Sequence, residues 1–275
     1  MGKAELGGIK VGDGRPVAII GVLNLSPESF YDGSVIRGSS QALRQARRML
    51  SDGADIIDVG AMSTAPNVKP ISMSSEKKRL LPVIKALVKE INAPISADTQ
   101  RAAVAEAALE AGAKIINDVS GLKADPKMAG VVADARCSAI LMAAKEKPGD
   151  AKRIGDVRAA LQESLRICRR HGIDARKIVI DPGIGFGKGA EWDLHILANL
   201  QRLAVLRRPI CVAVSRKAFI GKILGLPNPN DRLLGSLAAT AIAVQNGAAV
   251  VRTHDPKETA QVVRVAEAIL RSAKD

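Results

Sequence analysis

Short apolar segments alternate with amphipathic segments along nearly the whole chain, and this alternation constrains the fold more than any other feature. Eight continuous apolar segments occupy residues 17–23, 54–60, 94–98, 114–119, 138–142, 177–181, 209–214 and 248–253. Continuous apolar strands are typical of a parallel sheet that is covered on both faces. Eight strands that alternate with helices predict a (β/α)8 barrel, and the chain of 275 residues fits one such domain of about 250 residues.

Helical periodicity fills the intervals between the strands. We expect helices at residues 41–51, from a cap at Ser74 or Ser75 to residue 91, and at 101–111, 126–135, 154–170, 192–203, 233–245 and 256–272. No linker interrupts the pattern, so residues 16–275 are expected to form the barrel. Residues 1–15 are rich in Gly and Lys and are expected to form a tail or a cover over the barrel bottom.

The composition restricts the core and the class of partner. Apolar residues make up 47% of the chain, but aromatic residues only 2%, so the core must consist mainly of Ala, Ile, Leu and Val. This scarcity argues against a surface that stacks nucleic-acid bases on aromatic rings. The net charge of +13 includes no run of five Lys or Arg. We therefore favour a solvated basic surface that steers a phosphorylated substrate, rather than nucleic-acid binding.

Cysteine usage and hydropathy indicate the compartment. Cys137, Cys168 and Cys211 are far apart in the sequence and lack metal-ligand spacing, so a reduced, cytoplasmic protein is expected. No apolar run approaches the ~18 residues that a membrane span needs, so no membrane association is expected.

Most of the predicted strands end in a polar side chain. In chain order the ends are Asn24, Asp58, Asp98, Asn117, Met142, Asp181, the corner of Ser215, Arg216 and Lys217, and Arg252 with His254. Met142 is the apolar exception. The C-terminal strand ends of a (β/α)8 barrel meet at one face, where the active site lies. Three long polar connections follow strands there, at residues 24–38, 61–74 and 215–231, as lids do.

Arg252 and His254 are two residues apart on the last predicted strand, so their side chains point to the same face. At a barrel mouth they would form a clamp for a phosphate-like anion, because Arg offers a planar fork of donors. The alternative is a structural Arg252 that pairs with a neighbouring carboxylate.

Asp98, Asn117 and Asp181 each lie at the end of an apolar strand. A carboxylate buried there needs partners, since burying it alone is very costly. Converging carboxylates and an amide suit a flat heterocycle with several N–H donors. Two alternatives stay open: a metal–carboxylate site, for which Asn24 is the better oxygen ligand, and salt bridges internal to the barrel.

The segment DPGIGFGK at residues 181–188 is not a phosphate-binding loop. Pro182 stands where the Walker pattern needs Gly, and the spacing of Gly183, Gly185 and Gly187 does not match the dinucleotide motif. These glycines are instead expected to let the backbone approach a ligand closely. Lys217 could hydrogen-bond a ring carbonyl or nitrogen, form a Schiff base, or be a solvated loop lysine.

Seven motifs in order resemble those of the dihydropteroate synthases, from about residue 17 to residue 270. They are GVLNLSPESFYDG (21–33), ADIIDVGAMSTAP (54–66), ISADT (95–99), IINDVSG (115–121), IDPGIGFGK (180–188), VSRKAFIG (214–221) and VRTHDPKE (251–258). The resemblance implies a (β/α)8 barrel that joins (7,8-dihydropterin-6-yl)methyl diphosphate to an arylamine and releases diphosphate. It further implies small-molecule substrates, a Mg²⁺ cofactor and a homodimer.

The same resemblance implies a role for each site residue. The catalytic residues would be Lys217, Asp98, Arg252 and His254. The pterin ring would be bound by Asp98, Asn117, Met142, Asp181, Phe186 and Lys217. Diphosphate would be bound by Asn24, Arg252 and His254, with Asn24 also a ligand of Mg²⁺. The arylamine pocket would be shaped by Pro27, Ser29, Phe30, Thr64, Pro66 and Ala218.

Two positions depart from the usual motifs of that family. Ala65 stands where the family usually has Arg, and Ala218 where it usually has Ser. Both changes remove groups that recognise a small carboxylated aniline, although Lys69 is close enough in sequence to replace the Arg. They resemble an archaeal-type branch of the family, and this resemblance implies that the arylamine is either p-aminobenzoate or a ribofuranosyl-aniline phosphate, in folate or methanopterin biosynthesis.

Two other functions stay open beside the synthase. A pterin-dependent methyltransferase would share the barrel and the pterin-binding pattern, but the pair of Arg252 and His254 argues against it, because no diphosphate leaves there. A non-catalytic pterin-binding protein is the second, because of Ala65.

Overall fold

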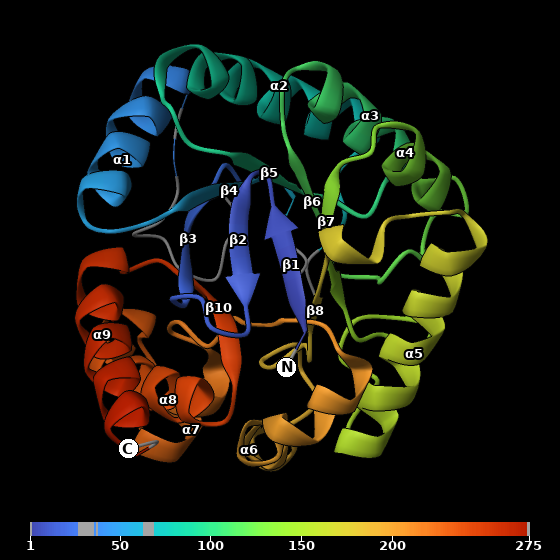
Figure 1. The fold of residues 1–275 in the computed structure, drawn as a ribbon. Coiled ribbons are helices and arrows are strands. Elements are labelled where there is room, and N and C mark those ends of the chain that lie inside the picture. The colour runs from blue at the N-terminus through green and yellow to red at the C-terminus, as the bar shows by residue number, and fades with distance from the viewer. Residues whose placement is uncertain (1, 27–35, 37, 63–68, 274–275) are drawn as a thin grey trace.

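Eight parallel strands close into a barrel that helices surround, in a computed structural model that describes residues 2–26, 36, 38–62 and 69–273 (Figure 1). The strands pair in the order β10-β3-β4-β5-β6-β7-β8-β9. Their bounds are β3 Ala18–Asn24, β4 Ile56–Gly60, β5 Ile95–Asp98, β6 Ile115–Asp118, β7 Ser138–Met142, β8 Ile178–Asp181, β9 Ile210–Val212 and β10 Ala248–Thr253. The predicted (β/α)8 barrel is confirmed.

The helices form the outer ring and bury their apolar faces against the strands (Figure 1). They are α1 Ser39–Ser51, α2 Met73–Glu90, α3 Ala102–Glu110, α4 Met128–Asp134, α5 Ile154–Arg170, α6 Ala190–Ala198, α7 Ala218–Leu224, α8 Leu233–Gln245 and α9 Pro256–Ser272, with short 3-10 helices η2 Ala175–Lys177, η3 Leu200–Leu206 and η4 Pro229–Arg232. No helix among the described residues is long and apolar enough to cross a membrane.

Two helix predictions were partly wrong, one in its N-cap and one in its continuity. The cap of α2 is Ser72, whose hydroxyl accepts from the N–H of Ser75 at 3.1 Å, rather than Ser74 or Ser75. The helix expected over residues 192–203 divides into α6 and η3. Asn199 separates the two because its side-chain amide donates to the carbonyl of His195 at 2.8 Å, which ends the α-helical turn.

The connection after β9 is not the polar lid that was expected over residues 215–231. It contains α7 and η4. Arg216 donates to the carbonyls of Pro229 and Asn230, and Arg232 donates to the carbonyls of Leu226 and Arg216. Both arginines are buried, so these bonds fix the segment as packed structure beside the strand end.

An antiparallel hairpin of β1 Lys3–Leu6 and β2 Ile9–Gly12 lies across the N-terminal end of the barrel, in front of the strands in Figure 1. Its Leu6 and Val11 are buried against a layer of barrel residues that includes Ile20, Ile56 and Ile115. Both the backbone N–H of Gly7 and the carbonyl of Glu5 bond the Ser138 hydroxyl at the start of β7. The hairpin therefore closes the bottom of the barrel, and the opposite end is left for the site.

Candidate active site

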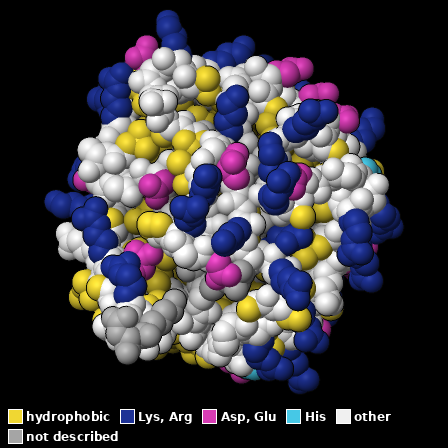
Figure 2. Space-filling view, in the orientation of Figure 1, with side chains coloured by type: hydrophobic (Ala, Val, Ile, Leu, Met, Phe, Trp, Pro, Cys, Tyr) yellow, Lys and Arg dark blue, Asp and Glu magenta, His cyan; other side chains and the backbone are white. Residues whose placement is uncertain are grey.

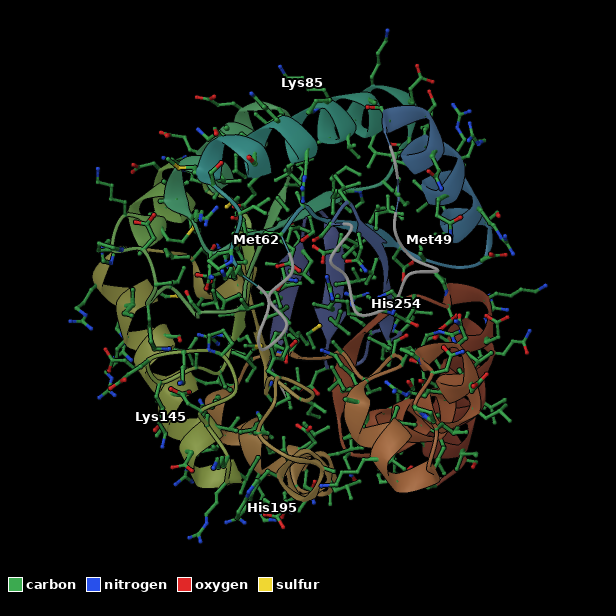
Figure 3. The ribbon with its side chains drawn as sticks, turned by 180° about the vertical axis from the view of Figure 1, so that it is seen from behind. Met49, Met62, Lys85, Lys145, His195 and His254 are labelled. Atoms are coloured by element: carbon green, nitrogen blue, oxygen red, sulfur yellow. The ribbon has the colours of Figure 1, made fainter. Side chains whose placement is uncertain are left out.

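A cavity of about 450 Å³ opens at the C-terminal ends of the strands, which we call the mouth cavity. Figure 3 views the molecule from this side, with Met62 and His254 beside the opening and Lys85, Lys145 and His195 toward the periphery. The predicted site residues in its wall are Asn24, Asp98, Asn117, Met142, Asp181, Phe186, Lys217, Ala218, Arg252 and His254. The structure thus brings them together, while their individual roles stay predictions. Pro27, Ser29, Phe30, Thr64 and Pro66 lie outside the described residues.

Arg252 on β10 is the centre of an ion cluster at the base of the mouth cavity. Its Nη2 lies 2.6 Å from Asp58 Oδ2 and 2.9 Å from Asp98 Oδ2, and its Nε donates to Asp58 Oδ2 at 2.7 Å. The side-chain amide of Asn117 donates to the same Asp58 oxygen at 3.2 Å. The alternative weighed above, an Arg252 paired with neighbouring carboxylates, is therefore observed. The charge of Arg252 is balanced within the protein.

Asp98 is the last residue of β5, and only one of its carboxylate oxygens, Oδ2, bonds Arg252. Burial raises the pKa of Asp98 to about 7, although the charge of Arg252 partly offsets it. Its Oδ1 is buried and has no hydrogen-bond partner among the described residues, and the same holds for Oδ1 of Asp58. Buried polar atoms are nearly always bonded, so an orphaned carboxylate oxygen marks a position where a ligand N–H or a water is expected.

Asp181 and Lys217 face the cavity from β8 and from the corner after β9. Burial raises the pKa of Asp181, while the N–H of Gly183, which donates to Asp181 Oδ1 at 2.6 Å, partly lowers it. Burial and the charge of Arg252 lower the pKa of Lys217 to about 8. Its Nζ lies 4.2 Å from the centre of the Phe186 ring, a cation–π distance. Lys217 therefore belongs to the cavity wall and is not a solvated loop residue.

Gly185 explains why the segment after β8 is rich in glycine. Its φ is +78°, and a Cβ at this position would lie 2.5 Å from Cδ of Lys217. The N–H of Gly185 donates to Asp193 Oδ1 at 2.8 Å, which anchors the segment to α6. Only glycine allows the backbone to pass this close to the lysine stem while Phe186 is placed against its ammonium group.

His254 is held by neighbours on both sides of its ring. Oγ of Ser215 lies 3.0 Å from Nδ1, and Nδ2 of Asn24 lies 3.4 Å from Nε2. Burial, followed by the charges of Arg252 and Lys217, lowers the pKa of His254 to about 3. The imidazole is therefore neutral near pH 7 and offers hydrogen bonds rather than a positive charge. This refines the anion clamp expected from the sequence.

The donor set of the mouth cavity bears on the expected Mg²⁺. The described residues contain no group of three His, Cys, Asp or Glu side chains that could hold a metal, which argues against a metal–carboxylate cage. Asn24, at the end of β3, offers an amide oxygen beside the opening. Such a site fits an ion that takes most of its ligands from a bound diphosphate and water, as Mg²⁺ does.

Sequence reasoning gave no role to Asp58 or Ser215, although each holds a predicted site residue. Asp58 is fully buried and bonds both Arg252 and Asn117. A carboxylate inside the apolar run IIDVG was the available signal, because it requires a buried cationic partner. Lys69 was considered as a substitute for the missing Arg, but it is exposed and does not lie in the cavity wall.

Comparison with known proteins defines the class to which this barrel and its polar mouth belong. A family model described as pterin binding enzyme matches residues 20–254, which is most of the chain. The described wall of the mouth cavity and six of the seven motifs fall within this range, and the seventh motif begins inside it.

Individual relatives narrow the class further. The chain is 40% identical over 252 residues to the dihydropteroate synthase of Bacillus subtilis, covering 92% of this chain and 88% of the relative. Its fold matches the Yersinia pestis dihydropteroate synthase in a sulfonamide drug complex, with a TM-score of 0.90 and 35% identity over 98% of this chain and 99% of the other. It also matches the Xanthomonas albilineans enzyme with 4-aminobenzoic acid, with a TM-score of 0.88 and 36% identity over 98% of both chains. The chain belongs to the dihydropteroate synthase family.

Proposed function

We propose that this chain joins (7,8-dihydropterin-6-yl)methyl diphosphate to p-aminobenzoate and releases diphosphate, in folate biosynthesis. The observation that carries the proposal is the mouth cavity, where Asp98, Asn117 and Asp181 on three strands converge with Lys217 from the corner after β9. Membership of the dihydropteroate synthase family supports the reaction type. The Xanthomonas albilineans relative with 4-aminobenzoic acid supports the choice of arylamine.

The pterin ring would be recognised by its hydrogen-bonding edge. The unpartnered Oδ1 of Asp98 and the carboxylate of Asp181 accept from amino and ring N–H groups, and the amide of Asn117 can both donate and accept. Lys217 donates to a ring nitrogen or carbonyl oxygen. Met142, buried in the wall, and Phe186 offer apolar surfaces for the ring.

The chemical step is a substitution at the methylene carbon. The lone pair of the neutral amine forms the new C–N bond, the C–O bond to diphosphate breaks, and diphosphate leaves with that electron pair. The amine proton then passes to water. The carboxylates of Asp98 and Asp181 favour the positive charge that develops on the ring, and positioning supplies much of the rate.

Diphosphate would leave toward the side of the cavity formed by Asn24 and His254. Neutral His254 and the Asn24 amide would contribute hydrogen bonds. Arg252 would contribute positive charge, and the diphosphate would compete with Asp58 and Asp98 for its guanidinium group. Asn24 would hold Mg²⁺ together with the diphosphate oxygens. Bound there, the ion would neutralise negative charge on the leaving group.

The missing hydroxyl at Ala218 favours a second candidate for the arylamine. Ala218 lies in the cavity wall, and its side chain offers no hydrogen-bond donor to a small carboxylate. A ribofuranosyl-aniline phosphate, in methanopterin biosynthesis, would carry its anion farther from this position. If this arylamine is the substrate, the chain would belong to an archaeal-type branch of the family.

The test is diphosphate release from the dihydropterin-methyl diphosphate in the presence of Mg²⁺, measured with each amine in turn. Release that depends on p-aminobenzoate is the expected result. Release with the phosphorylated amine alone would replace p-aminobenzoate by the second candidate. Pterin binding without release in either case would contradict the synthase and leave a methyltransferase or a binding protein.

We further propose a cytoplasmic homodimer. Cys137, Cys168 and Cys211 are buried free thiols, which supports a reducing compartment. Large apolar side chains are exposed on the neighbouring helices α8 and α9, among them Leu234, Val265 and Ile269. Exposed apolar side chains on neighbouring helices support self-association. Analytical ultracentrifugation of the wild type and of Leu234→Glu should give a dimer and a monomer, respectively, and a monomeric wild type would contradict the proposal.

A further inference from the structure

A second cavity, of about 640 Å³, lies between α5 and η3 at the end of the barrel opposite the mouth; we call it the base cavity. Its wall includes Ile178, the first residue of β8, and Arg208, which precedes β9. The last residue of β8 is Asp181, in the wall of the mouth cavity. The whole length of a strand therefore separates the two cavities, and their walls share no residue in the part of the chain that the structure describes.

The interior of the base cavity is apolar and large enough for a small organic molecule. Leu165 and Cys168 contribute from α5, Ile173 from the segment that leads into β8, Ile178 from the start of β8, and Leu206 from η3. Ligand sites in proteins commonly have volumes of about 300–1,000 Å³ and apolar walls with a few polar groups. The base cavity meets both conditions.

Among the described residues, the polar side chains in the wall of the base cavity are three arginines and one glutamine, and none is a carboxylate. They are Gln162, Arg166, Arg169 and Arg208. Arg166 is engaged, because its Nη2 lies 2.7 Å from Glu163. For Arg169 and Arg208 the described residues provide no ion pair. Figure 2 shows Lys and Arg side chains gathered on this face of the molecule along the side where α5 lies.

Arg208 carries the strongest indication of a missing partner. Its Nη1 donates to the carbonyl of Arg207 at 2.6 Å, but its Nε is buried without a hydrogen-bond partner among the described residues. A buried guanidinium donor that is left unbonded is costly, and the anion that suits a guanidinium fork is a carboxylate or phosphate.

We propose that the base cavity binds a small organic anion that has an apolar body and one carboxylate or phosphate head. Arg208 and Arg169 bind the head at the opening, and the apolar wall between α5 and η3 holds the body. This site is separate from the pterin and arylamine sites, and it does not depend on the reaction at the mouth.

The probe for this site is 2-naphthoate, titrated into the full-length protein by calorimetry beside neutral 2-naphthamide and 2-naphthyl phosphate. The naphthoate is expected to bind at least about tenfold more tightly than the amide, since a charge-assisted pair is lost in the amide. The phosphate arm distinguishes the two kinds of head.

Variants assign the binding to the base cavity. Arg208→Leu removes the donor and is expected to weaken naphthoate binding about tenfold or more. Arg158→Gln is the control for the loss of one positive charge, because Arg158 is exposed on α5 and does not line the cavity. Val205→Trp fills the opening from an exposed position, so it is expected to block binding without affecting folding.

Each result of these titrations either supports or overturns the proposal. Loss of binding in Arg208→Leu and Val205→Trp, with Arg158→Gln unchanged, supports the proposal. Equal binding of naphthoate to the wild type and to a folded Val205→Trp protein would overturn it. Displacement of all bound naphthoate by 7,8-dihydropteroate would also overturn it, because the probe would then occupy the mouth.

Discussion

The two ends of the barrel are built from the same eight strands but bury opposite kinds of side chain. At the base, Leu6 and Val11 of the hairpin pack on Ile20 and Ile56, all of them fully buried. At the mouth, two residues farther along β4, the fully buried side chain is Asp58. This apolar layer at the base contributes stability, whereas the mouth retains buried charge.

The buried charges at the mouth cost folding free energy but prepare the cavity for a ligand. Asp58 and Asp98 each keep one buried oxygen without a partner among the described residues, and such an atom costs about 1–3 kcal/mol. Burial also raises the pKa of Asp98 and lowers the pKa values of Lys217 and His254, which favours the neutral form of each side chain. Groups of this kind cluster at functional sites because a ligand supplies the missing partners.

The largest expected effect is that of Asp98→Asn at the mouth. We expect kcat/KM to fall about 10²–10³-fold, because an acceptor that stabilises the developing ring charge is lost. The free energy of unfolding should change by less than about 1 kcal/mol, since the raised pKa leaves Asp98 only partly charged near pH 7. Steady-state kinetics and urea denaturation of the same preparation measure both quantities. A large loss of stability with unchanged kcat/KM would contradict the assignment.

Leu6→Ala at the base should have the reverse effect. We expect the free energy of unfolding to fall by about 2–3 kcal/mol, because the hairpin can shift to fill part of the cavity. The value of kcat/KM at 25 °C should stay within about twofold of the wild type, since Leu6 lies at the far end of the barrel. Lys10→Ala, exposed on the same hairpin, is the control and should change stability by less than about 0.5 kcal/mol. Equal effects of both variants would show that the hairpin is not part of the core.

The pH dependence of kcat/KM should be bell-shaped. Asp98 offers ligand N–H groups a charged acceptor only when ionised, so activity should fall as the pH drops below its raised pKa of about 7. Lys217 donates best when protonated, so activity should also fall as the pH rises above its lowered pKa of about 8. A pH–rate profile of the wild type and of Asp98→Asn tests both limbs. An acid limb that persists unchanged in Asp98→Asn would belong to another group.

The smallest expected effect is that of Ala218→Ser in the cavity wall. A hydroxyl at the start of α7 would restore a donor beside the arylamine, and one neutral hydrogen bond is worth about 1 kcal/mol. We therefore expect KM for p-aminobenzoate to fall about fivefold with little change in kcat. Ala218→Val, which adds volume without adding a donor, is the control. The same gain in both variants would attribute the effect to packing.

The fold followed from the sequence because continuous apolar strands leave few alternatives. The expected strand at residues 248–253 coincides with β10, and that at 138–142 with β7. The hairpin at residues 3–12 was not predicted as one. Its signal was Gly7-Gly8, a turn of two residues with positive φ between two short strands.

The site was predicted as a set of strand ends but not as a network. Arg252 and Asp58 lie 194 residues apart, and only the closed order of the strands brings them into contact. The sequence therefore left open whether Arg252 binds an anion or a carboxylate. The packing of α7 and η4 likewise depends on Arg216 and Arg232. Their side chains donate to backbone carbonyls, and no local sequence pattern predicts such bonds.

Calorimetric titration of 6-hydroxymethyl-7,8-dihydropterin tests the central claim most directly, because it separates the binding of the ring from turnover. The wild type and Leu6→Ala should bind one pterin per chain with equal affinity, and Asp98→Asn should bind at least about tenfold more weakly. Equal affinity in the wild type and in Asp98→Asn would contradict the account, because the pterin would then not be held by the unpartnered oxygen at the barrel mouth.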